Sequence, residues 1–286
     1  MFRFSIVLLA TVLCASCVSH RPIQDSSSPP IDAANPLDGT PVALAWSSST
    51  QLMMGVDTGA VQTSLLFSPA VESIGARLRG RGAMRTANVP ISLKQDGEPM
   101  SRKQDVVMVD QAPYDGLLGW ECIRKYVWNI NYPKRSHRFF NKLPSRIRSW
   151  HKLALVPGSD YPQIADKHGR RIILDTGAPH AVYISKKRWN AIKLAYPDAF
   201  VSVYSGYSPA AGGFYAHECM HVSSFQLGPL ELKNILLCES FANPEVMGIP
   251  DDIDIILGYG ALISRQFWLD GPGCALYFSS TSYPMP

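Results

Sequence analysis

Short apolar runs separated by Gly, Pro, Ser and Asn turns cover most of this chain. Residues 42–46 and 51–56 form the first pair of such runs, and the polar residues 47–50 join them. Two strand-length apolar runs around a short polar turn predict a β-hairpin. A second hairpin is predicted before Asp175, with its turn at residues 167–170. The pattern therefore predicts a protein built mainly of strands.

Each predicted hairpin ends in the same four residues. Met54-Gly-Val-Asp57-Thr-Gly-Ala60 recurs as Ile172-Ile-Leu-Asp175-Thr-Gly-Ala178. A second element also repeats, because Asp115-Gly-Leu-Leu-Gly119 matches Asp254-Ile-Ile-Leu-Gly258. A short helix and a closing pair of strands are predicted after each of these glycines. Repetition in the same order indicates two copies of one structural unit.

An aromatic-rich strand follows each predicted short helix, at residues 127–132 and 266–270. Closing strands are predicted near residues 138–140 and 275–278. Each half is thus expected to end in a hairpin.

Two Asp-Thr-Gly-Ala sequences, each paired with an apolar-apolar-Gly element, resemble the pepsin and retropepsin superfamily of aspartic proteases. The Ala after Asp-Thr-Gly resembles the retroviral-type lobe, the tandem arrangement resembles pepsin, and the nearest match is a bacterial retropepsin-like lipoprotein. The resemblance covers residues 41–280 and implies an all-β fold of two similar retropepsin-like lobes. These would span residues 41–148 and 149–286, with the active-site cleft between them.

The resemblance implies an aspartic endopeptidase with Asp57 and Asp175 as its catalytic carboxyl groups, one from each lobe. Two carboxylates that share a site repel each other, so one keeps a proton and acts as acid while the other acts as base. Their protons belong to the pair, and the sequence leaves open which aspartate is protonated. No metal and no cofactor is expected.

Six further residues are expected to support the two loops: Thr58, Gly59, Thr176, Gly177, Gly119 and Gly258. The glycines after each threonine allow a tight turn that brings backbone amides near the carboxylate. By the resemblance, the two threonines hydrogen-bond across the lobe interface. The last two glycines let backbone pack closely behind each loop.

A polypeptide bound in extended form is the expected partner, held by strand-like main-chain hydrogen bonds. In the family a hairpin closes over the substrate, and residues 77–95 and 204–214 are the candidates for this cover. One alternative is a non-catalytic envelope protein of the same fold that binds peptide without cleaving it.

The sequence His217-Glu218-Cys219-Met220-His221 matches the H-E-x-x-H signature of zinc proteases. That motif works on a helix, where residues four apart share a face. In a strand the two histidines would lie ~13 Å apart, whereas a zinc ligand lies ~2 Å from the metal. Residues 214–227 are predicted to be a strand. A zinc metalloprotease is therefore the weaker alternative, with its third ligand left open.

Residues 214–227 and 230–240 are predicted to be two strands that turn at Gly228-Pro229. Counting outward from that turn puts Cys219 opposite Cys238, about 5.5 Å apart and within reach of a disulfide. An exported protein can oxidise such a pair. Two buried thiols are the alternative.

The N-terminus predicts export and lipidation. Arg3 precedes a short apolar run, and small residues then lead to Cys17, so residues 1–16 are predicted to be a signal peptide. Cys17 resembles a bacterial lipoprotein site, and residues 17–40 are predicted to be the lipidated Cys and a flexible tether. Val18 after that Cys favours the outer membrane.

Composition adds little to this picture. The chain has 286 residues, 46% of them hydrophobic, and a net charge of +4. This modest charge, scattered along the chain, does not favour nucleic-acid binding. We expect a monomer held at the membrane by its lipid.

Overall fold

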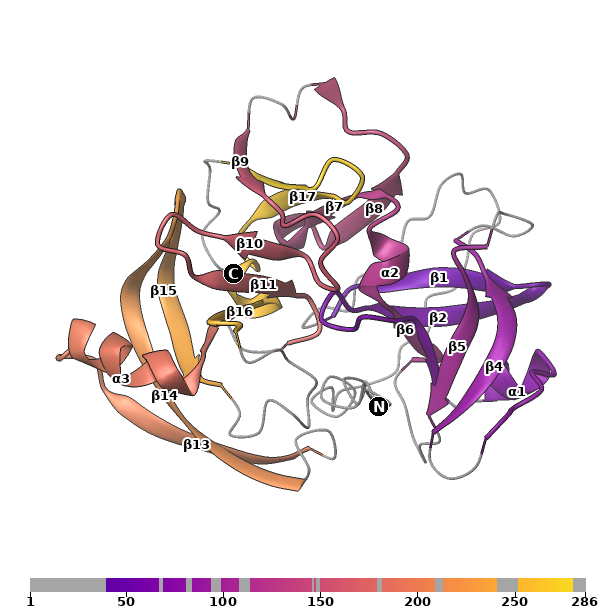
Figure 1. The fold of residues 1–286 in the computed structure, drawn as a ribbon, viewed down its shortest axis with the longest axis horizontal. Coiled ribbons are helices and arrows are strands. Elements are labelled where there is room, and N and C mark those ends of the chain that lie inside the picture. Colours follow the sequence, from indigo (N-terminus) through magenta and orange to yellow (C-terminus); the bar gives the residue numbers. More distant parts are fainter. Residues whose placement is uncertain are drawn as a thin grey trace.

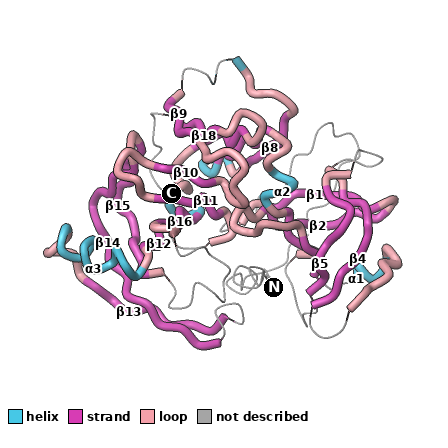
Figure 2. The backbone as a smooth tube through the Cα atoms, in the orientation of Figure 1, coloured by secondary structure: helices cyan, strands magenta, loops and turns pink. Residues whose placement is uncertain are grey.

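The structure is a computed structural model. It describes residues 40–66, 69–80, 84–93, 99–107, 114–145, 147, 150–178, 182–208, 213–240 and 252–279. Within these residues the strands form three sheets, and Figure 2 shows how little of the chain is helical. The all-β prediction is therefore confirmed. Cys17, the predicted signal peptide and the tether up to residue 39 lie outside the described residues.

The first sheet contains the strands around Asp57 (Figure 1). In spatial order it consists of β1 (Val42–Ser47), β2 (Thr50–Val56), β6 (Gly116–Leu118), β3 (Ser64–Leu66), β5 (Ser101–Val107) and β4 (Met84–Ile91). Strands β1 and β2 form the predicted antiparallel hairpin. Strand β6 runs parallel to β2 and places Leu118 beside Val56, so that Gly119 follows directly next to Asp57.

The second sheet contains the strands around Asp175. In spatial order it consists of β10 (Gln163–Ala165), β11 (Arg171–Asp175), β16 (Ile255–Gly258), β12 (Val182–Ile184), β15 (Leu230–Glu239), β14 (Gly213–Leu227) and β13 (Val201–Ser208). Strand β16 runs parallel to β11 and places Gly258 beside Asp175. The first four strands have the same order and directions as β1, β2, β6 and β3. The repeated sequence is thus a repeated structure.

The third sheet contains both predicted closing hairpins. It consists of β8 (Ser136–Phe140), β7 (Val127–Asn131), β17 (Gln266–Asp270), β18 (Ala275–Phe278) and β9 (His151–Ala154). Each aromatic-rich strand pairs with its predicted closing strand, β7 with β8 and β17 with β18. The two hairpins also pair with each other through β7 and β17, with Asn129 opposite Trp268, which the sequence did not predict. Strands from both sides of the predicted boundary at residue 148 therefore share one sheet, which Figure 1 draws above the other two.

The described helices are short and lie at the margins of the sheets. They are α1 (Pro69–Ser73), α2 (Trp120–Ile123), η1 (Tyr132–Lys134), α3 (Lys186–Ala195) and η4 (Tyr259–Ala261). Helices α2 and η4 follow Gly119 and Gly258, as predicted. Helix α3 was not predicted, and only Trp189 of its ten residues is buried. None of the described helices is long and apolar enough to cross a membrane.

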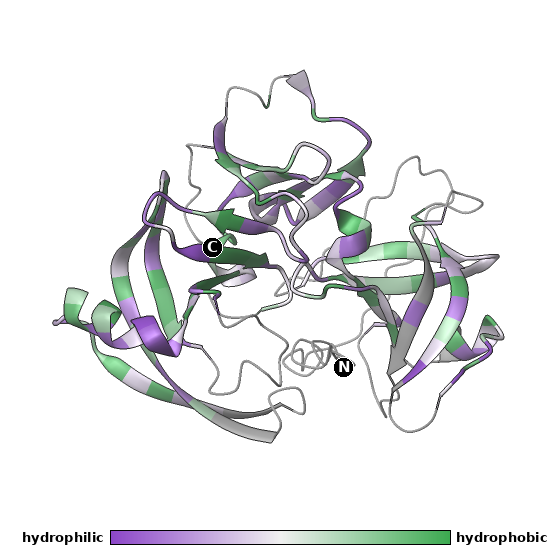
Figure 3. Cartoon of the chain, viewed as in Figure 1, coloured by the Kyte–Doolittle hydropathy of each residue, from purple (hydrophilic) through white to green (hydrophobic). Residues whose placement is uncertain are grey.

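Apolar side chains concentrate in the strands near the middle of the molecule (Figure 3). The largest fully buried side chains include Trp128 and Phe267 of the third sheet and Trp189 of α3. Removing these large side chains from water is the main favourable contribution to folding. The core thus joins the third sheet to both others.

The β14–β15 hairpin has the register that the sequence predicts. Cys219 lies opposite Cys238, and the structure joins them in a disulfide with their Cα atoms 4.1 Å apart. Both residues are fully buried. Among the described cysteines, Cys122 and Cys274 do not form a disulfide.

Replacing both bridged cysteines (Cys219→Ala with Cys238→Ala) will lower the free energy of unfolding by about 3 kcal/mol, because a bridge that closes a short loop restricts the unfolded chain. Urea unfolding measures this loss. Cys274→Ala, at a free and partly exposed cysteine, will stay within about 0.5 kcal/mol of wild type. A double variant as stable as Cys274→Ala would contradict the prediction.

Candidate active site

The two aspartates lie in equivalent loops. Asp57 directly follows β2, and Asp175 is the last residue of β11. The amides of Gly59 and Ala60 donate to Oδ1 of Asp57 at 2.8 and 3.2 Å. The amides of Gly177 and Ala178 donate to Oδ1 of Asp175 at 2.9 and 3.1 Å. The repeated sequence thus presents each carboxyl group in the same way.

The structure brings these two carboxyl groups together. Burial, and then the negative charge of Asp57 acting directly on Asp175, raise the pKa of the Asp175 carboxyl group. A side chain at Gly59 would not fit, because a Cβ there would lie only 2.3 Å from Cγ of Asp175. Glycine at this position is therefore required by the close approach of the second loop.

Thr58 and Thr176 join the loops by reciprocal hydrogen bonds. The Thr58 hydroxyl donates to the Leu174 carbonyl at 2.7 Å, and the Thr176 hydroxyl donates to the Val56 carbonyl at 2.7 Å. Each hydroxyl also accepts from the amide of the other threonine, at 3.0 and 3.1 Å. Both side chains are fully buried. The two loops are thus connected across their interface, as the resemblance implied.

The glycines behind the loops lie where the backbone is crowded. A Cβ at Gly119 would lie 2.4 Å from backbone atoms of Gln62. Directly after it, the amide of Trp120 donates to the Ala60 carbonyl at 2.7 Å. In the second loop the amide of Tyr259, directly after Gly258, donates to the Ala178 carbonyl at 3.1 Å. Each apolar-apolar-Gly element therefore supports the Asp-Thr-Gly-Ala loop of its own half.

Burial and like charge govern ionisation of the pair. Asp57 is 2% exposed, and Asp175 is partly exposed. Removal from water, followed by the negative charge of Asp57, raises the pKa of Asp175 well above its usual range, although the amides of Gly177 and Ala178 oppose this. The pair therefore retains a proton at pH values where ordinary aspartates have lost theirs.

Two buried tyrosines that the sequence did not single out lie within electrostatic reach of the pair. Burial raises the pKa of Tyr161 to about 12, with contributions from Asp160, Asp175 and Asp57. Burial and the charge of Asp57 also raise the pKa of Tyr114. Both phenols therefore stay neutral beside the carboxyl groups. No motif marked them, since they precede β10 and β6 in segments without a repeat.

The repeated aspartates before β6 and β16 have equivalent roles that the sequence did not assign. The amide of Met53 donates to Oδ2 of Asp115 at 2.8 Å, and the amide of Arg171 donates to Oδ2 of Asp254 at 3.0 Å. Each carboxylate thus holds the strand that leads to an Asp-Thr-Gly-Ala loop. Burial opposes ionisation of Asp254, but hydrogen bonds from Arg188, the Arg171 amide and Lys187 outweigh it and lower its pKa to about 2.

The H-E-x-x-H sequence lies on the strand β14 and not on a helix. His217 is buried against Tyr183, and Glu218 accepts from Trp189 Nε1 and Lys193 Nζ, both at 2.6 Å. In the described part of the chain, His217 also lies near the sulfurs of Cys219 and Cys238. Those sulfurs form a disulfide, whereas zinc binds thiolates. The helical arrangement that this motif requires is not present in β14.

Antiparallel pairing occurs in both segments proposed as covers. In the first, Arg79 and Thr86 form an isolated bridge, and residues 81–83 lie outside the described residues. In the second, β13 and β14 pair up to Ser208 and Gly213, and residues 209–212 lie outside the described residues. Their closure over a substrate stays a prediction.

No protein-family model matches the sequence, and no curated protein matches it. The chemistry of the site is therefore argued from its geometry.

Replacing either threonine by valine will lower the free energy of unfolding by about 2–4 kcal/mol, because Thr58→Val leaves the Leu174 carbonyl and the Thr176 amide buried without their partner. Thr58→Ser and Thr176→Ser keep the hydroxyl and will lose only about 1 kcal/mol. Denaturant unfolding separates the two cases. Equal losses for valine and serine would show that the hydroxyl contributes little.

Asp254 will stabilise the fold in a pH-dependent way. Because folding lowers its pKa from 3.8 to about 2, its contribution is fully present above its unfolded pKa and is lost as pH falls through about 2. Asp254→Asn will therefore be less stable than wild type at neutral pH, and the difference will shrink in acid. Urea unfolding of both proteins across this range is the measurement. A difference that does not change with pH would contradict this role.

Proposed function

We propose that the protein is an aspartic endopeptidase that hydrolyses peptide bonds through Asp57 and Asp175. The observation that carries the proposal is the close pair of carboxyl groups, presented by equivalent loops from two sheets whose first four strands have the same order. We further propose that these sheets belong to two similar retropepsin-like lobes in a pepsin-like arrangement, with the substrate cleft between them.

In the proposed reaction, one carboxyl group of the pair is ionised and the other holds a proton. The ionised group takes a proton from a water molecule as the water oxygen attacks the peptide carbonyl carbon, and the protonated group gives its proton to the carbonyl oxygen. In the resulting diol the C–N bond breaks as the leaving nitrogen receives a proton from the pair. The other carboxylate recovers a proton from a diol hydroxyl, so that the pair again holds one proton.

The loop hydrogen bonds support this chemistry. Each Oδ1 is occupied by two backbone amides, so Oδ1 of each carboxyl group is committed to its own loop. Such positioning fixes the reacting oxygens before the substrate arrives, which lowers the reorganisation that the transition state requires. The substrate would be an extended polypeptide. The predicted lipid on Cys17 would hold the enzyme at the bacterial envelope, at the outer membrane that Val18 favours.

Asp57→Asn or Asp175→Asn will reduce cleavage of an unfolded peptide library by at least ~10³-fold, because neither variant can supply both an acid and a base. Cleavage sites are identified by mass spectrometry from pH 3 to pH 8. Glu218→Gln is the matched control, since Glu218 is a carboxylate bonded to Trp189 and Lys193, and this variant will retain activity. Chelation with EDTA will likewise leave activity unchanged.

Two outcomes would contradict the proposal. Activity lost with EDTA and Glu218→Gln but kept in both Asp variants would indicate a metal enzyme. A wild-type protein that binds peptides of the library and cleaves none would favour an envelope peptide-binding protein.

A further inference from the structure

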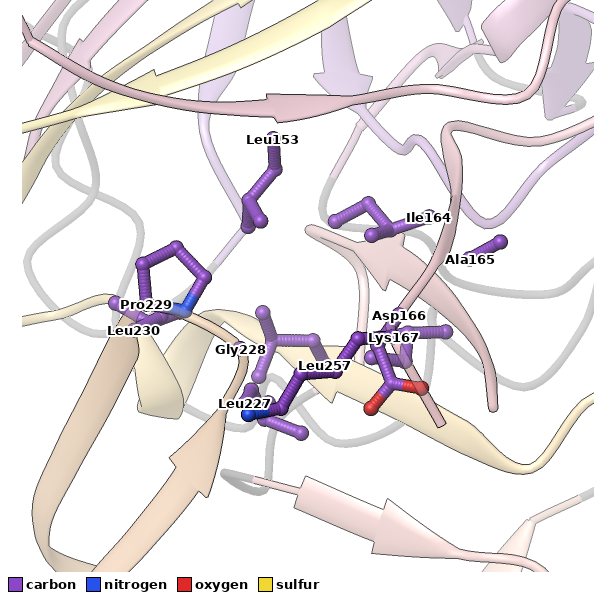
Figure 4. A pocket seen from close by; sticks show the side chains of 11 residues that line it. Leu153, Ile164, Ala165, Asp166, Lys167, Leu227, Gly228, Pro229, Leu230 and Leu257 are labelled. Carbon is purple, nitrogen blue, oxygen red and sulfur yellow. The ribbon is translucent and has the colours of Figure 1, made fainter. Parts of the chain in front are cut away.

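A second site lies apart from the catalytic loops. A cavity of about 380 Å³ opens between the β10–β11 turn, the β14–β15 turn and strand β9 (Figure 4). Its apolar walls include Leu153, Ile164, Ile172, Leu227, Leu230 and Leu257. None of the residues that line it belongs to the Asp-Thr-Gly-Ala loops.

The size and lining of this cavity suit a small apolar ligand. Its volume lies within the ~300–1,000 Å³ that small-molecule sites occupy, and such sites are mostly apolar with few polar groups. Protein interiors are close-packed, so an apolar opening of this size between strands is not ordinary core. It is also open to an entering ligand, because Ala165 and Lys167 on its rim are exposed.

Two charged residues line the cavity, and only one of them is neutralised within its turn. The Asp166 carboxylate accepts from Arg170 Nε at 2.6 Å and from the amides of Arg170 and His168 at 2.8 and 2.9 Å. Lys167 is exposed, and Figure 4 draws its side chain reaching from the β10–β11 turn toward Leu227. Arg170 is paired with Asp166 and Arg171 with Asp252, so the positive charge at the rim comes from Lys167.

We propose that this cavity binds the hydrocarbon chain of a single-chain anionic amphiphile, with the anionic head group paired to Lys167. An apolar cavity selects the chain, since its burial is favourable in proportion to the apolar area removed from water. A lysine at the rim selects the head group, because its long apolar stem covers the chain while its ammonium stays in water. The inference does not depend on the proposed protease activity.

Titration calorimetry of the purified full chain tests this with dodecanoate, decanoate and dodecyltrimethylammonium below their micelle concentrations. Dodecanoate will bind one molecule per chain, at least about fivefold more tightly than the cation of the same chain length. Decanoate will bind about 15-fold more weakly than dodecanoate, since each buried methylene contributes about fourfold.

Variants locate the site. Lys167→Ala will weaken dodecanoate binding about fivefold, and the matched control Lys142→Ala, at another exposed lysine that does not line the cavity, will not change it. Ala165→Trp fills the rim and will reduce binding at least about tenfold. Its unfolding transition reports whether the fold is retained.

Three results would overturn the proposal. These are no saturable binding of dodecanoate, equal affinity for the cationic amphiphile, and binding unchanged in both Lys167→Ala and a folded Ala165→Trp. The last result would mean that the amphiphile binds elsewhere on the protein.

Discussion

The reciprocal hydrogen bonds of Thr58 and Thr176 are the interaction on which the rest of the site depends. Asp57 and Asp175 come from strands far apart in the sequence, and like charges at close range in a buried site repel strongly. The carboxyl groups can share a proton only if the backbone holds them together against that repulsion. Each threonine does so by donating to the opposite strand and accepting from the opposite loop.

Around this junction, two sheets repeat one arrangement and a third sheet connects them. In each of the two repeated sheets the Asp-Thr-Gly-Ala loop follows the second strand, and backbone hydrogen bonds from the apolar-apolar-Gly element of the same half support that loop. The third sheet then takes strands from both halves, with β7 paired to β17. The threonine hydrogen bonds and the shared third sheet therefore both join the half that carries Asp57 to the half that carries Asp175.

Much of this plan could be predicted from local sequence. The hairpins before each aspartate, the glycines and the register that pairs Cys219 with Cys238 all follow from turn residues and strand periodicity, which act over short distances. The partner of an aromatic strand is set by tertiary packing, so the β7–β17 pairing was missed. The helix α3 and the phenol of Tyr161 were missed because neither belongs to the repeated sequence.

The central claim is that Asp57 and Asp175 share one proton. Infrared titration of the protein with ¹³C-labelled aspartate carboxyl groups tests it, with the Asp57→Asn variant as the reference for subtraction. The account predicts a protonated carboxyl band that persists above the ordinary aspartate pKa of about 3.9 and that shifts in the variant. Ionisation of both carboxyl groups near that ordinary pKa, each unaffected by replacing the other, would contradict it.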